Sequence, residues 1–240
     1  MTQELVWDRE YRNSKLLTKE NKPQSDVVRF VKYLKKNSPK WNEGFRQSEA
    51  SATTAQVLDL GSGAGRNSFY FAELGASVIG LEISKTAIEI AEGYIKNQNG
   101  LTYDISYVKQ SIGEKFPVEN DSVDIVLDVT SSNSLTEAER EIYLSESNRV
   151  LKPGGYFFVK ALCLEGDSNA KFLVKNYSGK EKDTYTMPEL GLTERVWSKE
   201  DFIKTYEKYF KIFSLERKTS YPRMNNRSYK RNFWIAYMTK

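Results

Sequence analysis

A short apolar run followed at once by three glycines constrains this chain more than any other feature. Residues 57–67 have the sequence V-L-D-L-G-S-G-A-G-R-N, and a helical pattern follows from Arg66 to Leu74. The apolar run predicts a buried strand, and the glycines predict a tight turn into a helix. Glycine suits such a turn because it adopts positive φ and lets backbone N–H groups approach a ligand. We therefore expect a ligand on this turn and on the start of the helix.

The glycine spacing argues against two common nucleotide sites. The pattern is G-x-G-x-G, whereas the dinucleotide fingerprint is G-x-G-x-x-G, and no Lys-Ser/Thr pair follows as a phosphate-binding loop requires.

Strand and helix patterns alternate after the glycine turn. Strands are predicted at residues 77–81, 105–109, 123–127, 155–160, 211–216 and 232–238. Helices are predicted between them, with Ser84, Thr136 and Ser198 as N-caps. This alternation predicts an α/β fold with a parallel sheet covered by helices on both faces. Ligands of such sheets bind outside the carboxyl ends of the strands.

Three segments together resemble the class I S-adenosylmethionine-dependent methyltransferases. The glycine turn resembles motif I of that family, F-P-x-x-x-x-x-V-D-I-V-L at residues 116–127 resembles its approach to strand four, and R-V-L-K-P-G-G-Y-F-F-V-K at Arg149–Lys160 resembles its passage into strand five. The resemblance covers residues 56–160 and implies a Rossmann-like, seven-stranded, mostly parallel sheet with an antiparallel last strand. It also implies S-adenosylmethionine as the cofactor, S-adenosylhomocysteine as the product, and no metal.

The resemblance also assigns roles to particular side chains. Asp59 is expected beside the methionine end of the cofactor, and Glu82 can accept hydrogen bonds from a ribose diol. Related enzymes commonly carry Asp where this chain has Ser111, so Gln110 or Ser111 would contact the adenine instead. The full set of expected cofactor contacts is Trp7, Tyr11, Asp59, Gly61, Ser62, Gly63, Gly65, Arg66, Asn67, Glu82, Ile83, Gln110, Ser111, Ile112, Asp128 and Val129.

Catalytic candidates are fewer. Asp128 ends the fourth strand and is expected to contact the methionine amino group or the methyl acceptor. Tyr11, in a W-D-x-x-Y pattern that resembles the entry helix of small class I enzymes, is the second candidate, and Trp7 and Arg12 are expected beside it as lid contacts. Tyr177 is a further candidate for orienting an acceptor.

Composition excludes several other chemistries. The chain has one cysteine, Cys163, and no histidine, so a cysteine-rich zinc site, a Ser-His-Asp hydrolase and an intrachain disulfide are ruled out. No disulfide-linked partner is expected. The sequence contains no run of about eighteen apolar residues, which a membrane-spanning helix requires. Its first ten residues include charged side chains and do not form the apolar core of a signal peptide. We expect a cytoplasmic protein with no membrane partner.

The domain organisation follows from these patterns. Residues 1–55 are predicted to form a helical lid or extension, including a helix capped by Ser25 and a polar connection over residues 37–54. Residues 56–240 are predicted to form the methyltransferase domain, with 161–196 as an insertion at the substrate site. Both ends are basic: residues 1–40 hold ten Lys/Arg against five Asp/Glu, and residues 217–240 hold seven against none.

The sequence thus predicts methyl transfer to an N or O atom of a small molecule, one that could be anionic. Absence of histidine is compatible with an acceptor of low pKa, which needs no strong base. An alternative is an RNA methyltransferase of the transfer-RNA type that uses the basic termini, including the cations and aromatics of residues 218–231. A second alternative is a catalytically silent binding module with the same fold.

Overall fold

A computed structural model describes most of the chain. The described residues are 2–13, 21–38, 41, 45, 54–97, 102–221, 223–224 and 227–240. Most of the connection predicted over residues 37–54 lies outside them.

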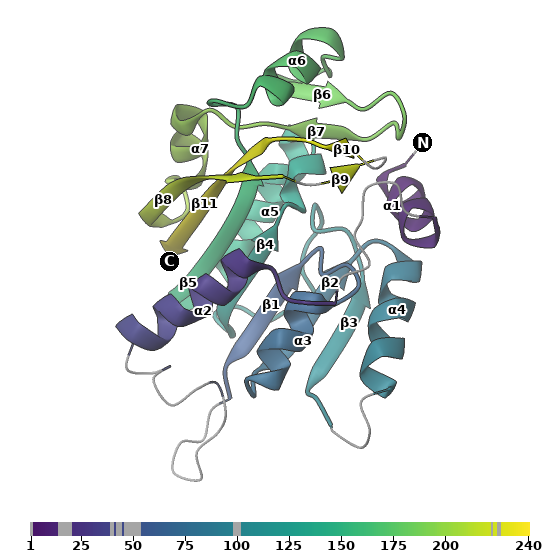
Figure 1. The fold of residues 1–240 in the computed structure, drawn as a ribbon. Helices are drawn as coiled ribbons and strands as arrows, with labels where there is room; N and C mark the ends of the chain where they lie inside the picture. The colour runs from purple at the N-terminus through teal and green to yellow at the C-terminus, as the bar shows by residue number, and fades with distance from the viewer. Residues whose placement is uncertain are drawn as a thin grey trace.

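A seven-stranded sheet forms the centre of the fold (Figure 1). Its strand order is β3-β2-β1-β4-β5-β11-β8, and β11 pairs antiparallel with both β5 and β8, whereas the other neighbouring strands are parallel. The strands are β1 (Gln56–Leu60), β2 (Ser77–Glu82), β3 (Ile105–Lys109), β4 (Val123–Val129), β5 (Leu151–Leu162), β8 (Lys211–Ser220) and β11 (Arg231–Thr239). The predicted Rossmann-like sheet with an antiparallel last strand is therefore confirmed.

Successive residues of the central strands pack on opposite faces of the sheet. In β1, Val57 belongs to one hydrophobic cluster and Leu58 to the other. The same alternation holds in β4, where Ile125 and Val126 lie in different clusters. A two-residue side-chain period is what a strand buried on both faces requires, and it gives the fold two cores with helices outside each.

Helices cover both faces. They are α1 (Gln3–Arg12), α2 (Ser25–Asn37), α3 (Arg66–Glu73), α4 (Lys85–Lys96), α5 (Glu137–Val150), α6 (Ser168–Asn176) and α7 (Lys199–Tyr206), with a short 3₁₀ helix, η2 (Ser132–Ser134). The predicted caps are confirmed at α4, α5 and α7, because Ser84, Thr136 and Ser198 accept hydrogen bonds from backbone N–H groups. The predicted cap at Ser25 is wrong: Gln24 holds the N-cap position of α2 without a side-chain cap bond.

The segment between β5 and α7 contains structure that the sequence pattern did not predict. It includes α6 and an antiparallel hairpin made of β6 (Thr184–Thr186) and β7 (Thr193–Arg195), beyond the carboxyl end of β5 (Figure 1). A second small hairpin, β9 (Arg223–Met224) with β10 (Arg227–Ser228), lies between β8 and β11 in the chain.

None of the helices in the described ranges is both long enough and apolar enough to cross a membrane.

Helix α2 belongs to the core of the domain. Its Phe30 is fully buried, with ring centroids 5.2 Å from Phe158 and 5.0 Å from Tyr237. The helix therefore holds the residues at its N-terminus in a fixed place relative to the sheet.

We expect Phe30→Ala to lower the free energy of unfolding by about 3–5 kcal/mol, because it removes a buried ring and leaves a cavity. Leu5→Ala, at a side chain that is 59% exposed, should change it by less than about 0.5 kcal/mol. Urea denaturation of the two variants measures the difference, and equal midpoints would show that α2 is not integral to the fold.

Candidate functional site

A cavity of about 670 Å³ opens at the carboxyl ends of the parallel strands. Most of the residues predicted from the sequence lie on its wall, namely Trp7, Tyr11, Asp59, Gly61, Ser62, Gly63, Arg66, Asn67, Glu82, Ile83, Gln110, Ser111, Ile112 and Val129. Gly65 and Asp128 do not. The structure therefore brings together side chains from four strand ends and from α1.

The glycine turn is bonded to the neighbouring strand. Gly61 and Gly63 have φ values of +64° and +58°, which L-residues with a Cβ rarely adopt. The Ser62 N–H donates to the carbonyl of Leu81 at 3.0 Å, and the Gly63 N–H donates to the Glu82 carboxylate at 2.8 Å. The backbone of the turn is thus held in place against the end of β2.

Glu82 is buried at the tip of β2 and lies on the cavity wall. Its Oε1 accepts a hydrogen bond from the Ser84 N–H at 2.8 Å, and its Oε2 accepts the one from Gly63. Burial raises the pKa of Glu82, and these backbone N–H groups oppose that effect. Each carboxylate oxygen can accept a further bond, so Glu82 can still receive hydroxyl donors from a ligand.

Asp59 is the second buried carboxylate on the wall. It is 2% exposed and accepts a hydrogen bond from the Ser68 hydroxyl at 2.6 Å. Burial raises the pKa of Asp59 to about 6, the Ser68 bond opposes this, and the nearby Asp128 carboxyl adds to it. Such a carboxylate can hold a cationic group of a ligand once it is ionised.

Asp128 lies beneath the loop that follows β4. Its Oδ1 accepts from the N–H groups of Ser131 at 2.9 Å and Ser132 at 3.3 Å, and its Oδ2 accepts from the Tyr143 hydroxyl at 2.7 Å. The residue is fully buried. This geometry orients the loop, and contact of Asp128 with a ligand stays a prediction.

Tyr11 closes the cavity over the glycine turn. A Cβ placed on Gly63 would clash with the Tyr11 hydroxyl, so the helix and the turn are in direct contact. Burial raises the pKa of Tyr11, so at neutral pH the side chain is an uncharged phenol and not a phenolate base. Its position supports a covering role, and a catalytic role stays a prediction.

Helix α1 is fixed by polar contacts to α4 and β3. Asp8 accepts from the Ser84 hydroxyl at 2.9 Å and from the Thr86 N–H at 3.0 Å, both at the N-terminus of α4. Glu4 pairs with Lys109 at 2.5 Å. Arg12, an expected lid contact, lies on the cavity wall and donates to the Thr86 hydroxyl at 3.2 Å.

Several wall residues were not predicted from the sequence. They are Gln3, Glu10, Asn13, Asn21, Gln24, Ala64, Ile90 and Leu135. Gln3 and Glu10 share a helix face with Trp7, so the i, i+4, i+7 spacing on α1 could have identified them. Gln24 stands in a turn without periodicity, and no sequence signal marked it.

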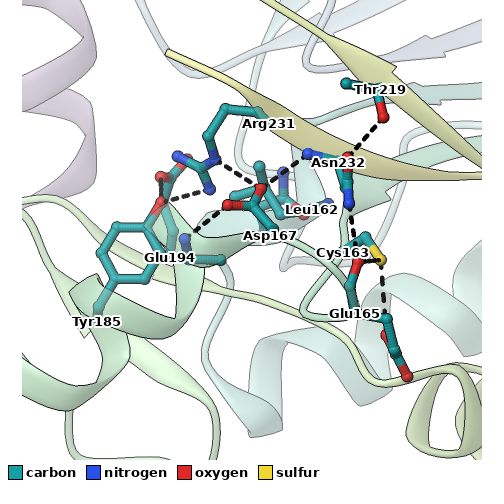
Figure 2. Close-up of polar contacts among 11 residues, drawn as sticks. Leu162, Cys163, Glu165, Asp167, Tyr185, Glu194, Thr219, Arg231 and Asn232 are labelled. Atoms are coloured by element: carbon teal, nitrogen blue, oxygen red, sulfur yellow. Dashed lines mark hydrogen bonds and ion pairs between the residues drawn. The ribbon is translucent and has the colours of Figure 1, made fainter.

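The segment 163–196 docks on the start of β11 through a polar network (Figure 2). Asp167 accepts from Arg231 Nε at 3.2 Å and from the Asn232 N–H at 2.8 Å, and the Tyr185 hydroxyl bonds to Glu194 at 2.6 Å. The same segment contacts helix α1 through a hydrogen bond of 3.1 Å from the Arg9 guanidinium to the carbonyl of Leu190.

This segment does not reach the described cavity wall, which contains no residue from 161–196. Tyr177 is 41% exposed at the end of α6. A part for this segment in the acceptor site stays a prediction.

Residues 57–155 match the family model described as a methyltransferase domain. An uncharacterized methyltransferase of Synechocystis sp. is 33% identical over 102 residues, covering 42% of this chain and 44% of that protein. A ubiquinone biosynthesis O-methyltransferase of Brucella anthropi is 33% identical over 107 residues, covering 45% of this chain and 41% of that protein. The chain thus aligns with less than half the length of these relatives.

Solved structures share the fold at low sequence identity. A SAM-dependent methyltransferase of Methanosarcina mazei superposes with a TM-score of 0.64 at 22% identity, covering 77% of this chain and 92% of that one. TehB of Haemophilus influenzae superposes with a TM-score of 0.61 at 16% identity, covering 98% of this chain and 67% of that one. Residues 57–155 therefore correspond to a methyltransferase domain, and the chain shares the fold of solved S-adenosylmethionine-dependent methyltransferases.

Proposed function

We propose that this protein transfers the methyl group of S-adenosylmethionine to an N or O atom of a small molecule. The observation that carries the proposal is the buried Glu82 carboxylate on the cavity wall, bonded to the N–H groups of Gly63 and Ser84. A carboxylate held this way beside a glycine turn fits a ribose diol. Asp59, on the same wall, fits the ammonium of a methionine group.

The residues present suit the cofactor. Bound S-adenosylmethionine would supply a sulfonium methyl group that is already electrophilic. Glu82 would hold the sugar, Gln110 and Ser111 would lie beside the base, and Asp59 would lie beside the amino acid portion. The protein's own part is to align the acceptor and exclude water, which α1 does by covering the turn with Tyr11.

The size and cover of the cavity favour a small acceptor. A volume of about 670 Å³ lies within the range typical of small-molecule sites, about 300–1,000 Å³. Helix α1 closes one side of it through contacts with α4 and with Leu190. The relatives named as ubiquinone biosynthesis O-methyltransferases favour oxygen as the acceptor atom.

Two cations of the basic C-terminal segment are bound within the protein. Lys218 pairs with Asp26, and Arg231, whose side chain is 12% exposed, pairs with Asp167 at 3.2 Å. Because Lys218 and Arg231 already have carboxylate partners, they are less available to RNA phosphates than unpaired cations would be. This pairing lowers the support for an RNA methyltransferase.

We expect transfer RNA to bind weakly, with a log–log salt slope smaller than the charge of the basic ends alone would give, because Lys218 and Arg231 already pair with Asp26 and Asp167. Fluorescence anisotropy of labelled transfer RNA between about 50 mM and about 200 mM salt measures this slope. A steep slope with tight binding at low salt would favour the RNA alternative instead.

We expect Glu82→Gln to weaken S-adenosylhomocysteine binding by about 1–3 kcal/mol, because it removes a charged acceptor of hydroxyl bonds. Glu89→Gln, on the exposed side of α4 where it pairs with Lys85, is the matched control and should bind like the wild type. Titration calorimetry gives both affinities. Wild-type protein that binds the ligand but fails to methylate any acceptor in a cell extract would indicate a silent binding module.

We expect binding of S-adenosylhomocysteine to weaken as the pH falls through about 6, the pKa of Asp59. Below that pH Asp59 is protonated and no longer attracts an ammonium group, so the affinity should drop about tenfold per pH unit. Above it the affinity should be level. Calorimetry between about pH 5 and about pH 8 should show a smaller slope of affinity against pH for Asp59→Asn than for the wild type. An equal slope would assign the titration to another group.

A further inference from the structure

The side-chain amide of Gln24 has a defined orientation at the cavity wall. Lys160 Nζ lies 3.0 Å from Gln24 Oε1. An ammonium can only donate, so the oxygen of this amide must face Lys160 and the NH₂ group must face the other way. Gln24 lies on the cavity wall, and its NH₂ group is therefore a donor available to a ligand.

Asn67 presents a second amide nitrogen beside it. Its Oδ1 accepts a hydrogen bond from the backbone N–H of Gln24 at 3.0 Å, which again leaves the NH₂ group as the outward donor. Asn67 is 6% exposed and lies on the same wall. Within the described part of the chain, neither amide nitrogen has a protein acceptor.

A cluster with a net positive charge lies behind Gln24, built around the buried carboxylate of Asp26; the Lys160 side chain is 12% exposed and the Lys218 side chain 37%. Lys160 is 2.9 Å from Asp26 and its ammonium is 4.7 Å from the centre of the Phe233 ring. Lys218 also pairs with Asp26, so two ammonium groups share one buried carboxylate. Arg29 lies 3.8 Å from Asp26 but is balanced by Glu216 at 3.0 Å.

This cluster is better explained by ligand positioning than by stability. Buried ion pairs contribute little net stability because desolvation offsets their attraction. Here the second lysine leaves an excess positive charge, which favours an anion nearby. Helix α2 begins at Ser25, next to Gln24, and the positive end of its dipole adds to the same field.

Two of the three acidic groups on the described wall have other assignments, and the third, Glu10, lies on α1. Asp59 and Glu82 lie at the glycine turn, where the proposed function gives them the amino and sugar groups of the cofactor. Gln24 and Asn67 instead offer only N–H donors, and the group that two N–H donors and a positive field recognise best is a carboxylate.

We propose that Gln24 and Asn67 form a carboxylate-binding subsite, with Lys160 as the positioning residue that sets the Gln24 amide. The carboxylate belongs either to the methionine portion of the cofactor or to the methyl acceptor. This inference rests on the proposed function for the identity of the cofactor, and the experiment below separates the two.

The test compares two probes that differ by the amino acid portion. S-adenosylhomocysteine carries a carboxylate, and 5′-methylthioadenosine does not. Gln24→Glu keeps an acceptor for Lys160 but replaces the outward donors with a negative oxygen. Asn37→Asp makes the same chemical change at the far end of α2, where Asn37 bonds the carbonyl of Tyr33, and serves as the control.

If the cofactor supplies the carboxylate, Gln24→Glu should lower the affinity for S-adenosylhomocysteine by about 10- to 100-fold. The affinity for 5′-methylthioadenosine should stay within about twofold of the wild-type value. Lys160→Met should also lower the affinity for S-adenosylhomocysteine relative to 5′-methylthioadenosine, but by a smaller factor than Gln24→Glu does, because the Gln24 amide is then free to turn. A general loss of folding would weaken both probes equally and would not change their ratio.

If the acceptor supplies the carboxylate, both probes should bind the variant as they bind the wild type. Benzoate should then raise the melting temperature of the wild-type complex with S-adenosylhomocysteine more than benzamide does, and Gln24→Glu should abolish that difference. The subsite is overturned if Gln24→Glu changes neither the probe ratio nor the preference for benzoate. Failure of the wild-type protein to bind either adenosine probe would contradict the proposed function instead.

Discussion

The bond from the Gly63 N–H to the Glu82 carboxylate is the contact on which the site depends. A buried carboxylate must be hydrogen-bonded, and Glu82 receives one N–H from the glycine turn and one from Ser84. It therefore fixes two loops relative to each other. Ser84 also caps α4 and donates its hydroxyl to Asp8, so the lid docks on the same point. Turn, strand tip and lid are thus held by one group of bonds.

Most of the cofactor side of the cavity could be predicted from the sequence because its signals are local. An apolar run, a glycine turn and a helix cap each occupy a few consecutive residues, and a parallel sheet necessarily collects the strand ends at one edge. Glu82 and Ser111 follow strand ends in the chain, and both lie on the wall. The central sheet was predictable for the same reason.

Residues whose place depends on strand register or on tertiary contacts were not predictable in this way. Asp128 lies one residue before the end of β4, and it pairs in register with Leu60, whose side chain packs in the same cluster as Tyr143. Paired residues on adjacent strands point to the same face, so Asp128 faces α5, whereas Asp59, one residue earlier on β1, faces the other side. Gln24 is on the wall because α2 packs on the sheet and because Lys160, two residues before the end of β5, bonds to it; neither contact leaves a pattern in the sequence.

The two sides of the cavity are built by different means, and this bears on how acceptor preference can change. The sheet side is formed by backbone turns and buried carboxylates that neighbouring strands hold. The other side is formed by N-terminal segments. Polar contacts of Asp8 and Glu4 attach α1 to the start of α4 and to Lys109. Helix α2 is attached by the ion pairs of Asp26 and by the buried ring of Phe30. Substitutions at the wall residues of these segments can therefore alter what lies opposite Asp59 and Glu82 without disturbing the strands that position them.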